Sequence, residues 1–198
     1  MPINETFILK PENRACLQRI KDKYGAKLKE AADLTGTTEE ILAGICMQET
    51  RGGESKLLVD ISGTPDNPAD DVGDHGHGHG LMQIDDRSYP EYILSGKWRD
   101  PFESFCMAGR ILRDFRKVLT RIITQAVQQE LLTPVCLELQ FIERATVASY
   151  NCGPGNVMKA LAAHEDVDAR TAGHNYSYCV LAFAGYYKHL TTGEANES

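Results

Sequence analysis

The chain has 198 residues, and its 42 % hydrophobic and 25 % charged content is ordinary for a globular protein with one substantial core. Its 28 acidic and 21 basic residues give a formal net charge of −7, which argues against nucleic acid and anionic membrane surfaces as non-specific partners. No apolar run approaches the roughly 20 residues of a membrane span. The start, MPINETFILKPENR, lacks the basic and apolar stretches of a secretory signal. A removed leader, export by a non-classical route and retention inside the cell therefore all stay open.

The first part of the chain predicts two helices. Residues 11–34 repeat apolar side chains at helical spacing, with lysines elsewhere. Residues 38–50 predict a second, short helix, because Thr37 and Glu40 have the spacing of a capping box at its start. The glycine pair at 52–53 then predicts its end.

One acidic residue, Glu49, closes the apolar face of the second predicted helix. Leu42, Ile45 and Glu49 fall at i, i+3 and i+7, so the carboxylate lies on the stripe that should face the core. A carboxyl group on such a face, near a helix C-terminus whose dipole disfavours an anion, is expected to have a raised pKa. A general acid needs this environment near neutral pH, so Glu49 is a candidate acid catalyst.

The segment after this helix, residues 53–90, loses helical periodicity and contains the run GHGHGHG before LMQID. We expect loops there with one or two short strands, around residues 57–61 and 81–84. In an extended strand the alternating histidines of the run would share one face, and these are His75, His77 and His79. Such convergence would suit either a metal ion or a pH-sensitive rim of a cleft.

The second half of the chain predicts further helices. The pairs Asp100–Pro101 and Thr133–Pro134 are typical of helix N-termini, and the turn NCGPG at 151–155 is typical of a helix end. After the first pair we expect a buried stripe of Ile111, Leu112, Phe115, Val118, Leu119 and Ile122. The remaining helices are expected over residues 135–150, 156–162 and 176–190. The fold class is therefore mainly α, a helical domain with a small irregular β region inserted after the Glu49 helix.

The six cysteines are scattered and contain no C-x-x-C pair. Their even number permits three disulfides, whose connectivity the sequence does not resolve. Their spacing fits no zinc-ribbon pattern, and buried free thiols are an equal alternative to bridges.

Four motifs in order carry a resemblance to a known family. CMQET, GDHGHGHGLMQID, SYNCGPGNV and NYSYCVLAFAGYYK resemble the goose-type lysozyme pattern, within the lysozyme and soluble lytic transglycosylase superfamily. The resemblance covers roughly residues 38–190 and implies an α+β lysozyme-like fold. It divides the chain into an N-terminal helical extension, 1–37, packed on a catalytic domain, 38–198. Relatives carry other residues between the same glycines, so we expect no metal and no cofactor.

The resemblance also assigns roles. Glu49 matches the family's catalytic acid, which protonates the glycosidic oxygen, and Asp74 and Asp85 match the two aspartates thought to hold the attacking water. Asp86, the neighbour of Asp85, is expected to be a surface charge. The resemblance and the motifs nominate six substrate-binding residues, which are Gln83, Tyr89, Phe115, Tyr150, Asn151 and Tyr176. Tyr89 stands where the family often has histidine.

The function implied is a muramidase that cleaves the β-1,4 bond between N-acetylmuramic acid and N-acetylglucosamine by inversion. An inverting enzyme separates its two carboxyl groups by about 6.5–9.5 Å to admit water. The alternatives are a lytic transglycosylase, which forms a 1,6-anhydro product, a peptidoglycan-binding module without turnover and a histidine-loop metal-binding module. The expected partners are bacterial peptidoglycan and an inhibitor or immunity protein at the cleft, with the enzyme a monomer acting outside the cell or in the periplasm.

Overall fold

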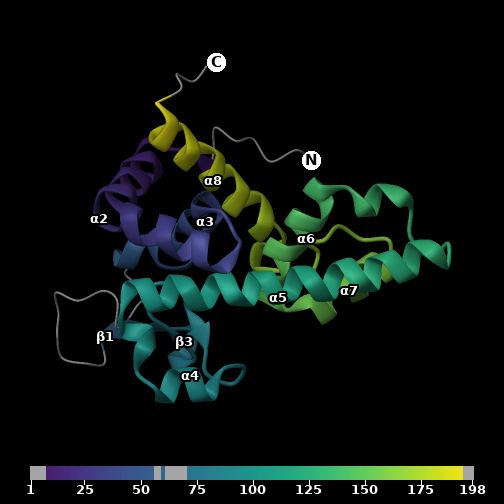
Figure 1. Ribbon diagram of the computed structural model, residues 1–198, viewed down its shortest axis with the longest axis horizontal. Helices are drawn as coiled ribbons and strands as arrows, with labels where there is room; N and C mark the ends of the chain where they lie inside the picture. Colours follow the sequence, from purple (N-terminus) through teal and green to yellow (C-terminus); the bar gives the residue numbers. More distant parts are fainter. Residues whose placement is uncertain (1–7, 56–58, 61–70, 194–198) are drawn as a thin grey trace. The chain divides into compact units, whose positions relative to one another are not determined.

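The computed structural model describes residues 8–55, 59–60 and 71–193, and it confirms a mainly helical fold with a small antiparallel sheet (Figure 1). The chain divides into two units. One comprises the described residues up to Gly109 together with those from Ala182 onward, and the other comprises Arg110–Leu181. None of the described helices is both long enough and apolar enough to span a membrane.

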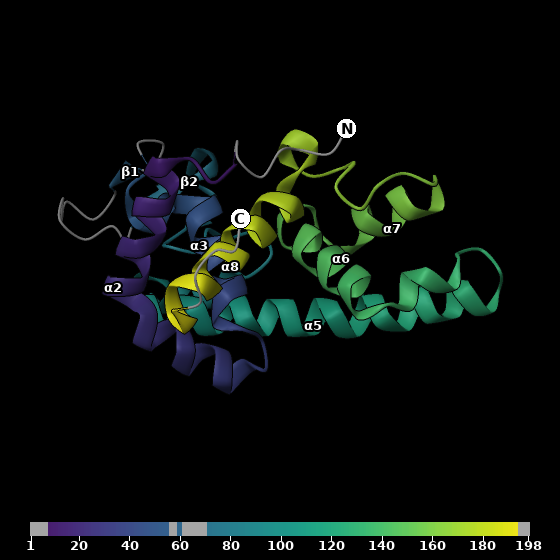
Figure 2. The ribbon, with the colours of Figure 1, turned by 90° about the horizontal axis from the view of Figure 1, so that it is seen from above.

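Two N-terminal helices of the first unit follow the prediction closely. Helix α2 spans Pro11–Thr35 and helix α3 spans Glu39–Thr50, and the two pack against each other (Figure 2). The predicted capping residue was wrong by one position. Thr38 caps α3, and its hydroxyl oxygen accepts a hydrogen bond from the Ile41 amide at 3.3 Å. The reason is that the extended backbone of Thr38 places its hydroxyl over the first turn.

Helix α3 is buried around most of its circumference, rather than along one apolar stripe. Leu42 and Ile45 are fully buried as predicted, but the residues between and around them are buried as well, namely Ile41, Ala43, Gly44, Cys46 and Met47. Glu49 is half-buried near the C-terminus of this helix. The helix therefore holds its backbone rigidly while it presents one carboxyl group at its end.

Within the described ranges the sheet contains four short antiparallel strands in the order β1-β2-β3-β4. They are β1 (Val59–Asp60), β2 (Asp71–Gly73), β3 (Gly78–His79) and β4 (Ile84–Asp85). The strand predicted around residues 57–61 lies partly outside the described residues. The strand predicted at 81–84 is displaced and begins only at Ile84, because Gln83 takes a left-handed φ of 47° and its amide donates to the Gly80 carbonyl, which closes a turn over residues 80–83.

The first two helices after the sheet each begin at a proline, and a capping residue precedes the second of them. Helix α4 spans Pro90–Leu94, and α5 spans Pro101–Gln128 behind Asp100, whose carboxylate accepts from the Glu103 amide at 3.0 Å. The pair Thr133–Pro134 opens a short 3-10 turn instead of the predicted helix, because Glu138 is extended. The remaining helices are α6 (Leu139–Cys152), α7 (Pro154–Ala162) and α8 (Tyr176–Thr192).

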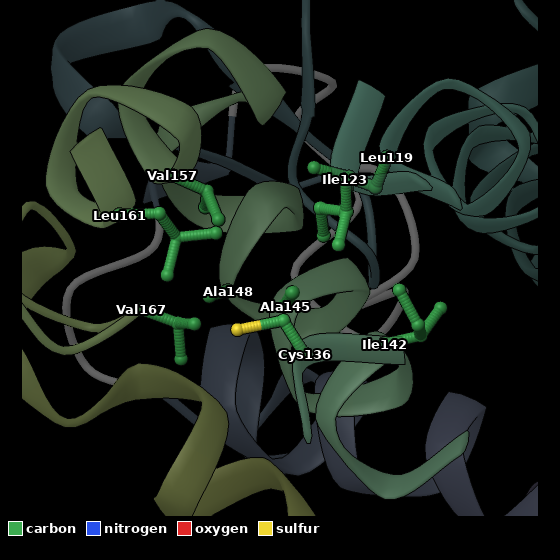
Figure 3. Close-up of a cluster of buried hydrophobic side chains, with 9 residues drawn as sticks. All are labelled: Leu119, Ile123, Cys136, Ile142, Ala145, Ala148, Val157, Leu161 and Val167. Carbon is green, nitrogen blue, oxygen red and sulfur yellow. The ribbon is translucent and has the colours of Figure 1, made fainter. Parts of the chain in front are cut away.

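The second unit has its own apolar core (Figure 3). Side chains from α5, α6, α7, the short turn before α6 and the segment after α7 meet there, namely Leu119, Ile123, Cys136, Ile142, Ala145, Ala148, Val157, Leu161 and Val167. Ile123, and not the predicted Ile122, is fully buried. The predicted stripe of α5 is therefore correct in period and shifted by one residue at its end.

All six cysteines are free thiols. Burial raises the pKa of Cys46 to about 12, so this thiol stays protonated at neutral pH. The Cys16 thiol donates to the Arg51 carbonyl at 3.2 Å, so it serves as a polar contact between α2 and the end of α3.

The packing of two helix glycines predicts opposite effects on stability. A Cβ at Gly109 would come within 2.7 Å of the Cβ of buried Thr35, whereas a Cβ at Gly25 meets nothing closer than 3.5 Å. We expect Gly109→Ala to lower the free energy of unfolding by about 1–3 kcal/mol through overpacking. Gly25→Ala should raise it by about 0.5–1 kcal/mol through helix propensity. Denaturant unfolding of both variants measures the difference, and equal effects would contradict this packing argument.

Candidate active site

Glu49 is placed by the residue that follows it. Thr50 is fully buried, and its hydroxyl donates to the Leu81 carbonyl at 2.9 Å and accepts from the Gly53 amide at 3.2 Å. Leu81 opens the LMQID motif that ends at Asp85. The hydrogen bond therefore joins the end of the Glu49 helix to the turn that leads into the Asp85 strand.

The carboxylate of Asp85 is held by its own turn. One oxygen accepts from the Ser88 amide at 2.8 Å, and the other accepts from the Arg87 guanidinium at 2.9 Å from Nε. Partial burial opposes ionisation, but the hydrogen bonds from Arg87 and Ser88 outweigh it and lower the pKa of Asp85. Asp85 is thus an anion over the whole range above its ordinary pKa of about 3.9.

Asp74 and Gln83, the other nominated residues between β2 and β4, have surroundings that differ from those of Asp85. Asp74 opens a 3-10 turn, Asp74–Gly76, directly after β2, and its side chain lies outside what the structure describes. Gln83 turns back over the loop, and its amide nitrogen donates to the Gly80 carbonyl at 2.9 Å. Gly78 lies beneath it, since a Cβ at that position would come within 3.1 Å of the Gln83 side-chain carbon.

The histidine run converges on a carboxylate. His77 Nδ1 lies 2.9 Å from one oxygen of Asp86, and His79 Nε2 lies 3.6 Å from the other. Asp86 is partly exposed, as expected of a surface charge, but it is also paired with the two histidines that precede it on the neighbouring strand and turn. The hydrogen bond from His77 lowers the pKa of Asp86. His75 is exposed, and within the described ranges no three His, Cys, Asp or Glu side chains form a metal-binding group.

Three of the nominated substrate residues of the second unit lie beside the loop between α7 and α8 or at its end. The side-chain oxygen of Asn151 accepts from the Ala172 amide at 2.8 Å, and Asn151 is otherwise exposed. The Tyr176 amide donates to the Thr171 hydroxyl at 3.4 Å, and its ring is buried. Tyr150, next to Asn151, is half-buried. The loop before α8 is therefore held by hydrogen bonds both to α6, through Asn151, and to the first residue of α8, Tyr176.

The last two nominated residues, Tyr89 and Phe115, are half-buried aromatic side chains at different helices. Tyr89 is half-buried at the start of α4, where its amide donates to the Asp85 carbonyl at 3.0 Å. Phe115 is half-buried on α5 in the second unit.

A buried acid that the sequence did not single out organises the same loop. Asp168 is 1 % exposed, and its two carboxylate oxygens accept from the Ser177 amide at 2.9 Å and the Ser177 hydroxyl at 2.6 Å. Arg144 lies 3.3 Å away and offsets its charge. Since Ser177 is in the first turn of α8, the anion also meets the positive end of that helix.

Comparison with known proteins settles the family. The family model "Lysozyme g" matches residues 17–191, which include α3, the described part of the sheet and the loop before α8. The chain belongs to the lysozyme g family. It is accordingly a glycoside hydrolase of the goose type, a lysozyme with peptidoglycan as its substrate class.

Individual relatives agree with this family. Lysozyme g of Struthio camelus is 27 % identical over 84 % of this chain and 67 % of its own length. Lysozyme g of Takifugu rubripes is 29 % identical over 84 % of this chain and 75 % of its own length. Lysozyme g of Gallus gallus is 28 % identical over 84 % of this chain and 64 % of its own length.

The Asp168 network predicts a clear difference between two neighbouring acids. Asp168→Asn would remove the buried negative charge that faces Arg144. It would also replace one of the two oxygens that accept hydrogen bonds from Ser177 with an amide group that donates. We therefore expect the free energy of unfolding to fall by about 3–5 kcal/mol. Asp166 also pairs with Arg144, but its side chain is 55 % exposed. Asp166→Asn should cost less than about 1 kcal/mol. Denaturant unfolding tests the pair, and an equally mild effect at both positions would contradict the buried role.

Proposed function

We propose that this chain cleaves the β-1,4 bond between N-acetylmuramic acid and N-acetylglucosamine with inversion at the anomeric carbon. In this mechanism Glu49 is the general acid that protonates the glycosidic oxygen. Asp85 and Asp74 hold and activate the water that attacks from the opposite face of the sugar. The observation that carries the proposal is the Thr50–Leu81 hydrogen bond, because it ties the Glu49 helix to the strand of Asp85.

The two acids have environments that suit different roles. Glu49 is half-buried near the end of a helix whose other residues are mostly buried, and the C-terminal dipole there disfavours an anion. Asp85 receives hydrogen bonds from a guanidinium and a backbone amide, both of which stabilise its anion. A pair of carboxyl groups whose surroundings differ in this way supports one proton donor and one permanent base.

The six nominated substrate residues remain part of the proposal. We assign Tyr89, Phe115 and Tyr150 to contacts with sugar rings, since each is a half-buried aromatic side chain. Asn151 uses its oxygen internally and keeps its amide nitrogen for a substrate hydroxyl or acetamido oxygen. Gln83 and Tyr176 lie at well-packed positions, so we assign them to the shape of the binding surface.

We also propose that the enzyme acts where peptidoglycan is exposed, outside the cell or in the periplasm. With a net charge of −7, the chain has no general attraction to anionic cell walls, so affinity must come from specific contacts with the sugar. A protein inhibitor or immunity protein would act most simply by covering Glu49.

Glu49→Gln should abolish cleavage and leave the fold intact. The amide keeps the size of the side chain but cannot donate a proton to the leaving oxygen, and a general acid contributes about 10²–10⁴-fold to the rate. The measurement is turnover of purified peptidoglycan with analysis of product ends, in which hydrolysis yields reducing sugars. Glu54→Gln is the matched control, because Glu54 forms an exposed ion pair with Arg19.

Each other result of this experiment has a definite meaning. Near-wild-type turnover by Glu49→Gln would falsify the assignment of the acid. Products of the wild type with 1,6-anhydro ends would make the enzyme a lytic transglycosylase. If the wild type and Glu49→Gln both bound peptidoglycan and neither cleaved it, the protein would be a binding module and not an enzyme.

Arg87→Gln should move the acidic limb of the pH–rate profile to higher pH. Asp85 must be ionised to hold water, and it loses its charge as the pH falls through a pKa that Arg87 helps to lower. Removal of the guanidinium raises this pKa, so the rate should begin to fall at a higher pH than in the wild type. The profile of kcat at constant ionic strength measures the shift. Arg113→Gln, which alters an exposed ion pair on α5, should leave the limb in place.

A further inference from the structure

The alternating histidines have no role in the proposed chemistry, yet they make a specific contact. We call His77, His79 and Asp86 the histidine–aspartate clamp. Asp86 touches the preceding hairpin segment in three ways. Its amide donates to the His77 carbonyl at 3.0 Å, one carboxylate oxygen lies 2.9 Å from His77 Nδ1, and the other lies 3.6 Å from His79 Nε2.

The inner half of the clamp is fixed by packing. His79 is 8 % exposed, and its ring meets the edge of buried Trp98 with a centroid distance of 4.9 Å. Both ring nitrogens of His79 are buried, and neither has a hydrogen-bond partner within the described part of the chain. One carboxylate oxygen of Asp86 lies against this buried imidazole, 3.6 Å from its Nε2.

Asp86 directly follows Asp85, the proposed water-holding residue. Asp85 pairs with Gly78 across β3 and β4, and a glycine offers no side chain to hold its partner. The carboxylate of Asp85 is bound by Arg87 and Ser88, which lie on the same turn. Asp86 is the first residue after β4, and its own carboxylate makes the contacts with the histidines. These contacts therefore leave the half-buried Asp85 carboxylate accessible while they hold the adjoining backbone.

We infer that Asp86, held by His77 and His79, is a positioning residue that fixes the Asp85 carboxylate for catalysis. This inference rests on the proposed function, because it assigns a task to Asp85. The glycines of the GHGHGHG run alternate with the histidines, and this spacing brings His77 and His79 to the same carboxylate. His75 has a left-handed φ of 55° and is exposed, so it is not part of the clamp.

The first test compares Asp86→Asn with Asp33→Asn, an identical change at an exposed position on α2. A displaced catalytic group costs up to about 10²-fold in rate, and we expect Asp86→Asn to lower kcat about tenfold or more with KM unchanged. Asp33→Asn should have wild-type kinetics. A wild-type kcat for Asp86→Asn, or a rise in KM alone, would overturn the inference.

The second variant pair guards against simple misfolding. His77→Ala removes the donor to Asp86, and His77→Gln restores a donor without an imidazole. We expect the alanine variant to lose kcat as Asp86→Asn does and the glutamine variant to recover most of it, with equal thermal unfolding midpoints for the two. Equal kcat values in the two variants would overturn the clamp.

A double-mutant cycle with Asp85→Asn separates the inference from the function on which it rests. Asp85→Asn alone should lower kcat partially, and Asp86→Asn added to it should cause no further loss, because Asp86 acts through Asp85. Independent, multiplicative losses would overturn the inference and leave the proposed function standing. A wild-type kcat for Asp85→Asn alone would overturn the role of Asp85 in the proposed function, and the inference with it.

Discussion

The arrangement of the candidate site depends on one buried hydroxyl group. Thr50 follows the proposed acid, and it donates to Leu81 while it accepts from Gly53. A single side chain thereby stops α3, turns the chain and attaches the helix end to the segment that leads to Asp85. Because Thr50 and Leu81 are both fully buried, a Leu81 carbonyl left unpaired would carry the full cost of desolvation. The geometry of the acid relative to the loop is therefore set by folding, before any substrate arrives.

Three acids in this protein illustrate how surroundings, rather than residue type, decide a role. Glu49 lies half-buried at a helix end, Asp85 is held as an anion by its own turn, and Asp168 is buried and paired with Arg144. Asp168 has its carboxylate filled by contacts from within the protein, so it supports the loop before α8 and has no capacity left for substrate. Glu49 and Asp85 keep the exposure that a reacting group requires.

Much of the fold followed from local pattern, and the errors lie where partners are distant. Helix α2 was predicted to end at residue 34 and ends at Thr35, because periodicity and capping are encoded within a few residues. Strands β2 and β3 were missed, and β4 was predicted too early, since strands this short are defined by pairing across the chain. Asp86 looked like a surface charge for the same reason, and its histidine partners became evident only with the register of β3 and β4. Nothing near Asp168 in the sequence indicates that packing will bury it.

Gln83 lies directly over Gly78, so a side chain there would collide with it, while of the two neighbours of Gly78 His77 is partly exposed and His79 is buried against Trp98. At Gly78 the residue type is restricted by the space that Gln83 leaves. At the neighbouring positions it is restricted by the contacts that each side chain makes. The loop can thus exchange its variable positions during evolution without a change in its path. Specialisation of the enzyme to a new wall polymer would be easiest to acquire at His75, the exposed histidine outside the clamp.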